Sequence, residues 1–291
     1  MPDGPKNDIA RVIAHRLNSW EMLAAFREPV KQPAGRLIST VLRPPSQQNL
    51  AALSSDLRKL ALSGSLVPTI VDICVAATTL TRYTNDKQHF NLNIFQNHAR
   101  GVLTKLRDAL TSDLLTPLEF QLSCGLVAYC VQLWEPTGPT DAHEVGPPQQ
   151  QLAALAQRFI NTKLFNDGTP TQLRAVTWCT IVFGSLLLQH DDTLRGQGHI
   201  VFVALMVVLE THHGSCEWAV VERRLRKFFW VDAPTVRWKA QWEAAVMRQQ
   251  LWEQQGYFML GPKRENAVVE YLVLRDARGS MPLIESLYKT L

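Results

Sequence analysis

Apolar residues recur three and four positions apart along almost the whole chain, the spacing that places side chains on one face of an α-helix. The first such stripe consists of Ile9, Val12, Ile13, Leu17, Trp20 and Leu23. Others follow in the segments 50–60, 67–80, 90–110, 118–134, 149–164, 175–188, 200–209, 215–229 and 233–252. Only the segment 268–274 has the composition of a β-strand. The pattern therefore predicts an all-α, multi-helix array of about ten helices, with at most one short strand near the C-terminus.

The composition indicates a large core. The chain has 291 residues, of which 46% are hydrophobic and 19% are charged, and its net charge is +4. The charged fraction is below the ~25% of an ordinary soluble domain, which favours wide apolar faces packed on one another. The positive charge is too small to indicate a nucleic-acid binder by itself, because such domains carry a concentrated basic stripe.

The segment 136–148 is rich in proline and polar residues and is the clearest loop in the chain. It divides the chain into an N-terminal helical half, residues 1–135, and a C-terminal helical half, residues 149–291. The alternative is one continuous domain over residues 8–291, in which the loop simply links two helices.

Five cysteines are present at wide spacings, without a Cys-x-x-Cys pair: Cys74, Cys124, Cys130, Cys179 and Cys216. The sequence therefore indicates neither a zinc ribbon nor a redox dithiol, and we expect reduced, mostly buried thiols. The N-terminal residues do not have the pattern of a secretory signal. The most apolar stretches, 175–188 and 200–209, are shorter than the ~20 residues of a spanning helix, so no membrane association is expected.

Two groups of residues were weighed as catalytic or metal sites. His190, Asp191 and Asp192 would suit a helical metal-dependent enzyme acting on a diphosphate substrate, but Arg195 follows where a further acid would be needed. His212 and His213 precede Cys216, but adjacent histidines point in different directions, and a zinc site needs three or four converging ligands. We therefore predict a helix terminus at His190, a polar loop up to His199, and no catalytic residue, metal or cofactor.

A basic run near residue 225 allows two interpretations. Its cations are Arg223, Arg224, Arg226 and Lys227. They could form a patch that binds an import receptor or contacts phosphate groups. They could also be the solvated face of an amphipathic helix whose core face carries Trp218, Val221, Leu225 and Phe228. The two interpretations are compatible.

Tryptophan is concentrated in the same region. Five of the eight tryptophans lie within 35 residues: Trp218, Trp230, Trp238, Trp242 and Trp252. We interpret them as a structural aromatic cluster. Trp218, Trp238 and Trp242 are predicted to be buried and to hold a helix over 216–229 against a helix over 233–252.

This region also resembles a known family. The stretch from Glu217 to Trp230, followed by Asp232 and by Trp238 to Glu243, is similar to the last helices of the helical regulatory region in fungal zinc-cluster transcription factors. The apolar helix from Arg174 to Leu188 resembles the helix that precedes them, so the similarity covers residues 150–252. The six closely spaced cysteines with which those factors bind zinc and DNA have no counterpart here. The resemblance implies a nuclear, helical regulatory domain without its own DNA-binding module.

The sequence thus favours a transcription-regulatory protein that acts through protein or small-molecule contacts and controls a fungal gene cluster. Its expected partners are other transcription components, and no direct sequence-specific DNA binding is expected. Two alternatives remain: the metal-dependent diphosphate enzyme, and an interaction scaffold outside the nucleus.

Overall fold

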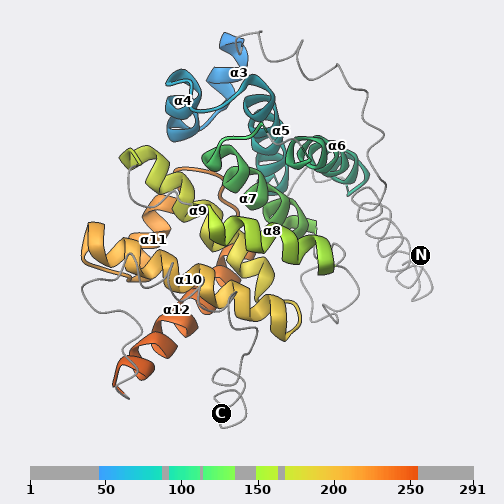
Figure 1. Ribbon diagram of the computed structural model, residues 1–291. Coiled ribbons are helices and arrows are strands. Elements are labelled where there is room, and N and C mark those ends of the chain that lie inside the picture. The colour runs from blue at the N-terminus through green and yellow to red at the C-terminus, as the bar shows by residue number, and fades with distance from the viewer. Residues whose placement is uncertain (1–45, 87–91, 112–113, 135–148, 163–167, 255–291) are drawn as a thin grey trace, which may run out of the picture.

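The computed structural model describes residues 46–86, 92–111, 114–134, 149–162 and 168–254. These residues form ten helices and contain no strand (Figure 1), which confirms the all-α prediction. The helices are α3 Gln47–Ala52, α4 Ser55–Leu62, α5 Pro68–Asn85, α6 Leu92–Leu110, α7 Pro117–Trp134, α8 Gln149–Asn161, α9 Pro170–Leu187, α10 Asp192–His213, α11 Trp218–Leu225 and α12 Asp232–Gln254. The helix predicted over 9–23 and the strand predicted over 268–274 lie outside the described residues.

Helix α9 is the interior element of the fold. Every side chain from Ala175 to Leu187 is buried, which explains why this segment is apolar on all of its faces. Helices α4, α7, α10, α11 and α12 pack around it (Figure 1). Its first turn is well defined, because Thr169 and Gln172 form a capping box and Pro170 occupies the first helical position.

Glycines allow the neighbouring helices to approach α9 closely. A Cβ atom on Gly125 of α7 would lie 2.9 Å from the Trp178 ring and 3.0 Å from the Cα of Cys179. A Cβ on Gly198 of α10 would lie 3.1 Å from the carbonyl oxygen of Gly184. These distances are shorter than ordinary carbon contacts, so the helix backbones pack at a separation that only glycine permits at these positions.

Helix α10 corrects one prediction. The polar loop expected between His190 and His199 is largely helical, because α10 already begins at Asp192. The Asp191 carboxylate accepts a hydrogen bond from the Leu194 backbone N–H at 3.1 Å and so caps the helix. Gly198 is helical because it lies where α10 crosses α9, and it is not part of a flexible loop. The helix ends at Gly214, whose φ of 65° is the left-handed conformation expected for a terminating glycine.

The stripe of residues 50–60 is also interrupted. It forms two helices, because Leu53 adopts an extended conformation between α3 and α4. The Arg58 side chain donates hydrogen bonds to the carbonyl oxygens of Leu50, Ala51 and Leu53. These bonds satisfy carbonyl groups that a continuous helix would have paired internally.

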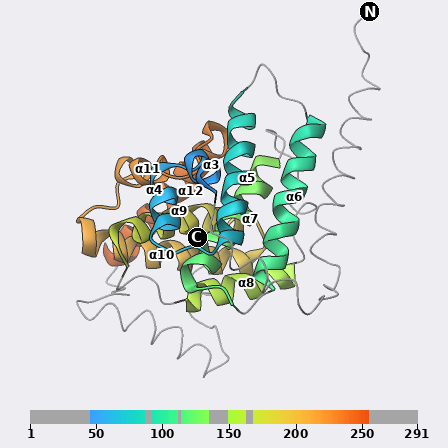
Figure 2. The same ribbon diagram turned by 90° about the horizontal axis from the view of Figure 1, so that it is seen from above.

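The helices on the two sides of the 135–148 segment share one apolar core. Helix α7 packs along α9, and α8 packs against both α7 and α10. Helices α5 and α6 lie side by side at one end of the molecule, as Figures 1 and 2 show. Helix α5 is also tied to α7 through the buried Glu119 carboxylate, which accepts hydrogen bonds from Val67 N–H at 2.5 Å and Thr116 N–H at 2.9 Å.

One described helix is long and apolar enough to cross a membrane by length and composition alone. It is α10, over Asp192–Glu210, and half of that stretch is buried inside the protein. Its packing against α8, α9 and α12 accounts for its apolar composition.

The close approach at Gly125 can be tested with Gly125→Ala. Alanine is the better helix former by ~1 kcal/mol, but its methyl group would collide with the Cys179 backbone, and overpacking costs about 1–3 kcal/mol. We expect the free energy of unfolding to fall, as measured by urea denaturation. Gly101→Ala is the matched control, because a Cβ there meets no atom within 4 Å, and it should raise stability by up to ~1 kcal/mol. Equal effects of the two substitutions would contradict the proposed helix contact.

Candidate functional site

The candidate site is the basic surface of α11, which lies on an aromatic core. Three tryptophans of this core, Trp178, Trp238 and Trp242, are fully buried. Their indole N–H groups all have acceptors: Trp238 donates to Gln132 Oε1 at 2.6 Å, Trp242 to the Cys216 carbonyl at 2.8 Å, and Trp178 to the Phe229 carbonyl at 3.1 Å. Burial of these large residues therefore leaves no indole donor unsatisfied.

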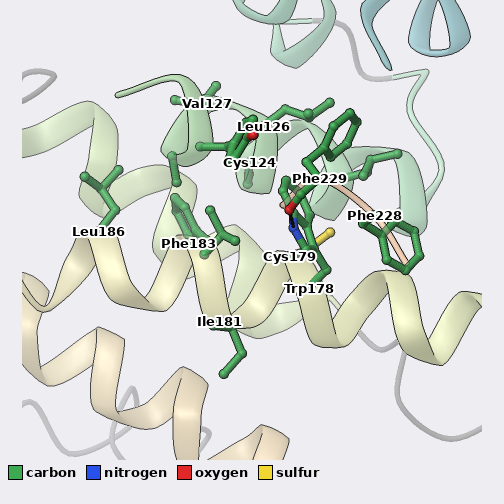
Figure 3. Close-up of a cluster of buried hydrophobic side chains, with 14 of the residues drawn as sticks. Cys124, Leu126, Val127, Trp178, Cys179, Ile181, Phe183, Leu186, Phe228 and Phe229 are labelled. Atoms are coloured by element: carbon green, nitrogen blue, oxygen red, sulfur yellow. Dashed lines mark hydrogen bonds between the residues drawn. The ribbon is translucent and has the colours of Figure 1, made fainter. Parts of the chain in front are cut away.

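Two of these hydrogen bonds hold α11 at its two ends. Trp242 binds the carbonyl of Cys216, just before the helix, and Trp178 binds the carbonyl of Phe229, just after it. The rings of Phe228 and Phe229 also lie 6.4 and 5.2 Å from that of Trp178. Figure 3 shows these three side chains together. Helix α11 is thereby fixed on the surface of α9 although it has only eight residues.

The tryptophans of the predicted cluster differ in how deeply they are buried. Trp238 and Trp242 are fully buried and Trp218 is almost so, whereas Trp230 is partly exposed. The side chain of Trp252 lies outside the described residues. The Trp238 ring lies 6.5 Å from Tyr129 of α7, and the Trp242 ring lies 5.5 Å from Phe202 of α10.

These ring contacts correct the expected role of the cluster. Trp238 and Trp242 attach α12 to α7 and α10, not only to α11. Helix α11 also spans only Trp218–Leu225, so it begins later and ends earlier than the expected 216–229. Trp178 could not be singled out from the sequence, because α9 is apolar on every face and periodicity distinguishes none of its residues.

The four cations of the basic run have different surroundings. Arg226 donates hydrogen bonds to Glu222 at 2.7 and 2.9 Å, and its guanidinium lies 4.1 Å from the centre of the Trp230 ring. Its charge is therefore largely compensated. Arg223 and Lys227 are exposed, and neither has an ion pair among the described residues.

Arg224 is the least exposed of the four cations. The side chain is half-buried, and its Nη1 atom is buried without a hydrogen-bond partner. Burial lowers the pKa of this guanidinium, and the positive charges of Arg174 and Arg223 lower that pKa further. Arg174 itself, on α9, donates from Nε to the buried Asp56 carboxylate at 2.6 Å. Arg224 is therefore a cation in a region where positive charge exceeds negative charge.

The residues weighed for catalysis have structural roles. Asp191 caps α10, Asp192 forms an ion pair with Arg195 at 3.0 Å, and His190 is buried. Within the described ranges, no group of three His, Cys, Asp or Glu side chains is placed to hold a metal ion. The side chains of His212 and His213 are not among those that the structure describes. Cys216 donates a weak hydrogen bond from Sγ to the Met206 carbonyl.

Helix α12 presents apolar side chains to solvent in addition to those it buries. Val236 is 73% exposed, Met247 63% and Leu251 49%. These residues recur at helical spacing on the side opposite the buried Trp238 and Trp242. Met247 and Leu251 are one turn apart, whereas Val236 lies about three turns before them, so the three side chains share a face without forming one continuous patch.

Comparison with protein-family models finds no match for this chain, and comparisons with curated proteins and with solved structures find none either. The resemblance of residues 150–252 to a regulatory region therefore stays a prediction from the sequence.

The structural role of the buried tryptophans can be tested by truncation. Trp242→Ala should lower the free energy of unfolding by about 3–5 kcal/mol, because it leaves a cavity and removes the hydrogen bond to Cys216. Trp230→Ala is the control, because Trp230 is partly exposed and loses a cation–π contact with Arg226 and a hydrogen bond to Asp232, so the loss should be smaller, about 1–2 kcal/mol. Chemical denaturation measures both. A Trp242→Ala protein as stable as its parent would contradict the buried role.

The cysteines can be tested with a thiol reagent. Burial raises the pKa of Cys74 and Cys130 to about 12, and it raises the pKa of Cys124 and Cys179 as well. Because only the thiolate reacts, these four should resist the reagent near pH 8 in the folded protein and react at once in denaturant. Rapid modification of any of them under native conditions, located by mass spectrometry, would contradict this assignment.

Proposed function

We propose that this chain is a nuclear transcription-regulatory protein that binds an acidic protein partner through the basic surface of α11. The observation that carries the proposal is the set of cations without a carboxylate partner on α11 and the turn that follows it. Arg223, Arg224 and Lys227 have no carboxylate partner among the described residues, while Glu222 is occupied by Arg226. Such a surface attracts acidic partners and speeds their association.

Two further observations favour a protein partner over nucleic acid. The exposed apolar side chains of α12, Val236, Met247 and Leu251, are of the kind that protein interfaces cover. The whole chain carries a net charge of only +4, which is small for a protein that binds duplex DNA alone. The resemblance of this region to fungal regulatory domains supports the nuclear setting.

The metal-dependent enzyme is less well supported. The two aspartates on which it depended are engaged, one in capping α10 and the other in an ion pair with Arg195. Neither role brings a further acidic group toward these aspartates, so the described residues do not assemble the several oxygen ligands that a metal ion would need there.

The proposal predicts a specific effect of charge reversal. In the full chain, Arg223→Glu with Lys227→Glu should abolish retention of the bound partner and the transcriptional response. The melting temperature should not fall, because both side chains are exposed. Retention by the parent protein should also weaken as salt rises, since surface charges are screened. The measurements are quantitative affinity capture of the identified partner, transcript profiling and thermal denaturation.

The matched control is Lys105→Glu on α6, compared with Lys227→Glu alone, because both lysines are exposed and the change of charge is the same. This control should retain the partner. A partner lost equally from these two variants would show that total charge matters and not the α11 surface. A fluorescently tagged protein excluded from the nucleus, or sequence-selective retention of duplex DNA by the purified protein, would refute the proposal.

A further inference from the structure

Two arginines, Arg174 on α9 and Arg224 on α11, belong to helices that pack on each other. The rings of Trp178 on α9 and Phe228 after α11 lie 6.4 Å apart, and Figure 3 shows them in contact. Arg174 lies four residues before Trp178, and Arg224 lies four residues before Phe228. Arg174 and Trp178 share a face of α9, and Arg174 is close enough for its positive charge to act on the Arg224 guanidinium.

The carboxylates near these arginines do not balance their positive charge. The Asp56 carboxylate serves Arg174 at 2.6 Å and also lies 3.9 Å from Lys59. The Glu222 carboxylate serves Arg226 at 2.7 Å. Arg223 and Arg224 therefore carry two positive charges that no described carboxylate offsets, and one guanidinium nitrogen of Arg224 is buried without an acceptor. A half-buried cation in this state is unfavourable unless an anion accompanies it.

We propose that the surface formed by Arg223 and Arg224, with Arg174 behind them, binds the phosphate group of a phosphate monoester. A phosphate monoester carries about −1.5 to −2 charges near pH 7, which matches two uncompensated cations better than a single carboxylate does. Its oxygens also suit the planar fork of a guanidinium group. The inference rests on the proposed function, because it names the chemical group on the partner that the α11 surface recognises.

The probe is inorganic phosphate, and the readout is the melting temperature of the full chain. Phosphate at about 20 mM, compared with chloride at equal ionic strength, should raise the melting temperature by about 4–7 °C if the dissociation constant is ~1 mM. Arg224→Gln should lose this response. Without phosphate, Arg224→Gln should melt at or above the parent temperature, because it removes a half-buried cation that is repelled by Arg174 and Arg223.

Arg226→Gln, at the residue that ends α11, is the matched control. Arg226 is already paired with Glu222, so this variant should keep the full phosphate response even if its own stability falls. The same shift in the parent and in Arg224→Gln would reveal a general salt effect and overturn the site. Absence of any shift in the parent would overturn it too.

A second arm distinguishes the sources of the phosphate. Fluorescence anisotropy compares a labelled acidic peptide containing phosphoserine with the same peptide containing serine. At least tenfold tighter binding of the phosphopeptide, lost in Arg224→Gln, would identify a phosphorylated partner. A response to inorganic phosphate with no preference for the phosphopeptide would identify a free phosphate ligand. This result would support the phosphate site but show that the site does not serve partner binding. A partner captured through α11 without any phosphate effect would retain the proposed function and overturn the phosphate site.

Discussion

The fold depends on the burial of α9 from Ala175 to Leu187. A helix without a solvent face must be covered on all sides, so helices from both ends of the described chain are drawn around it. Gly125, Gly184 and Gly198 then set how closely the backbones approach. Helices α4, α7, α10 and α11 pack mainly on α9, whereas α12 packs on α10 as well.

Side-chain hydrogen bonds complete what apolar packing begins. Gln132 of α7 accepts a hydrogen bond from Trp238 of α12 and donates one to the Val182 carbonyl of α9, so one buried amide connects three helices. Buried polar groups that are fully paired in this manner favour one arrangement over others of similar apolar packing. The same principle applies to Trp242 and Trp178, whose N–H groups donate hydrogen bonds to carbonyl groups just before and just after α11.

The all-α class could be predicted because helical periodicity is a local signal. The interruption at Leu53 and the early start of α10 could not, because they depend on hydrogen bonds from Arg58 and on the crossing of Gly198 with α9. Spacing alone likewise could not identify the partners of Trp238 and Trp242, since Gln132 and Phe202 are distant in the sequence. The basic run was visible as four similar cations, but the unequal surroundings of Arg224 and Arg226 appear only in three dimensions.

Helix geometry explains why these neighbouring cations differ. Successive residues are separated by about 100° around a helix, so Arg223 and Arg224 face different surroundings, and Arg226 pairs with Glu222 one turn before it. Arg224 is half-buried, and Phe228, just after the helix, packs on Trp178 and holds this end of α11 on α9. The end of α11 that is anchored on the core therefore also holds a cation partly away from water. An anion bound at Arg224 would act directly on the attachment of α11 to the core, which gives this surface a physical route from ligand binding to a change in stability.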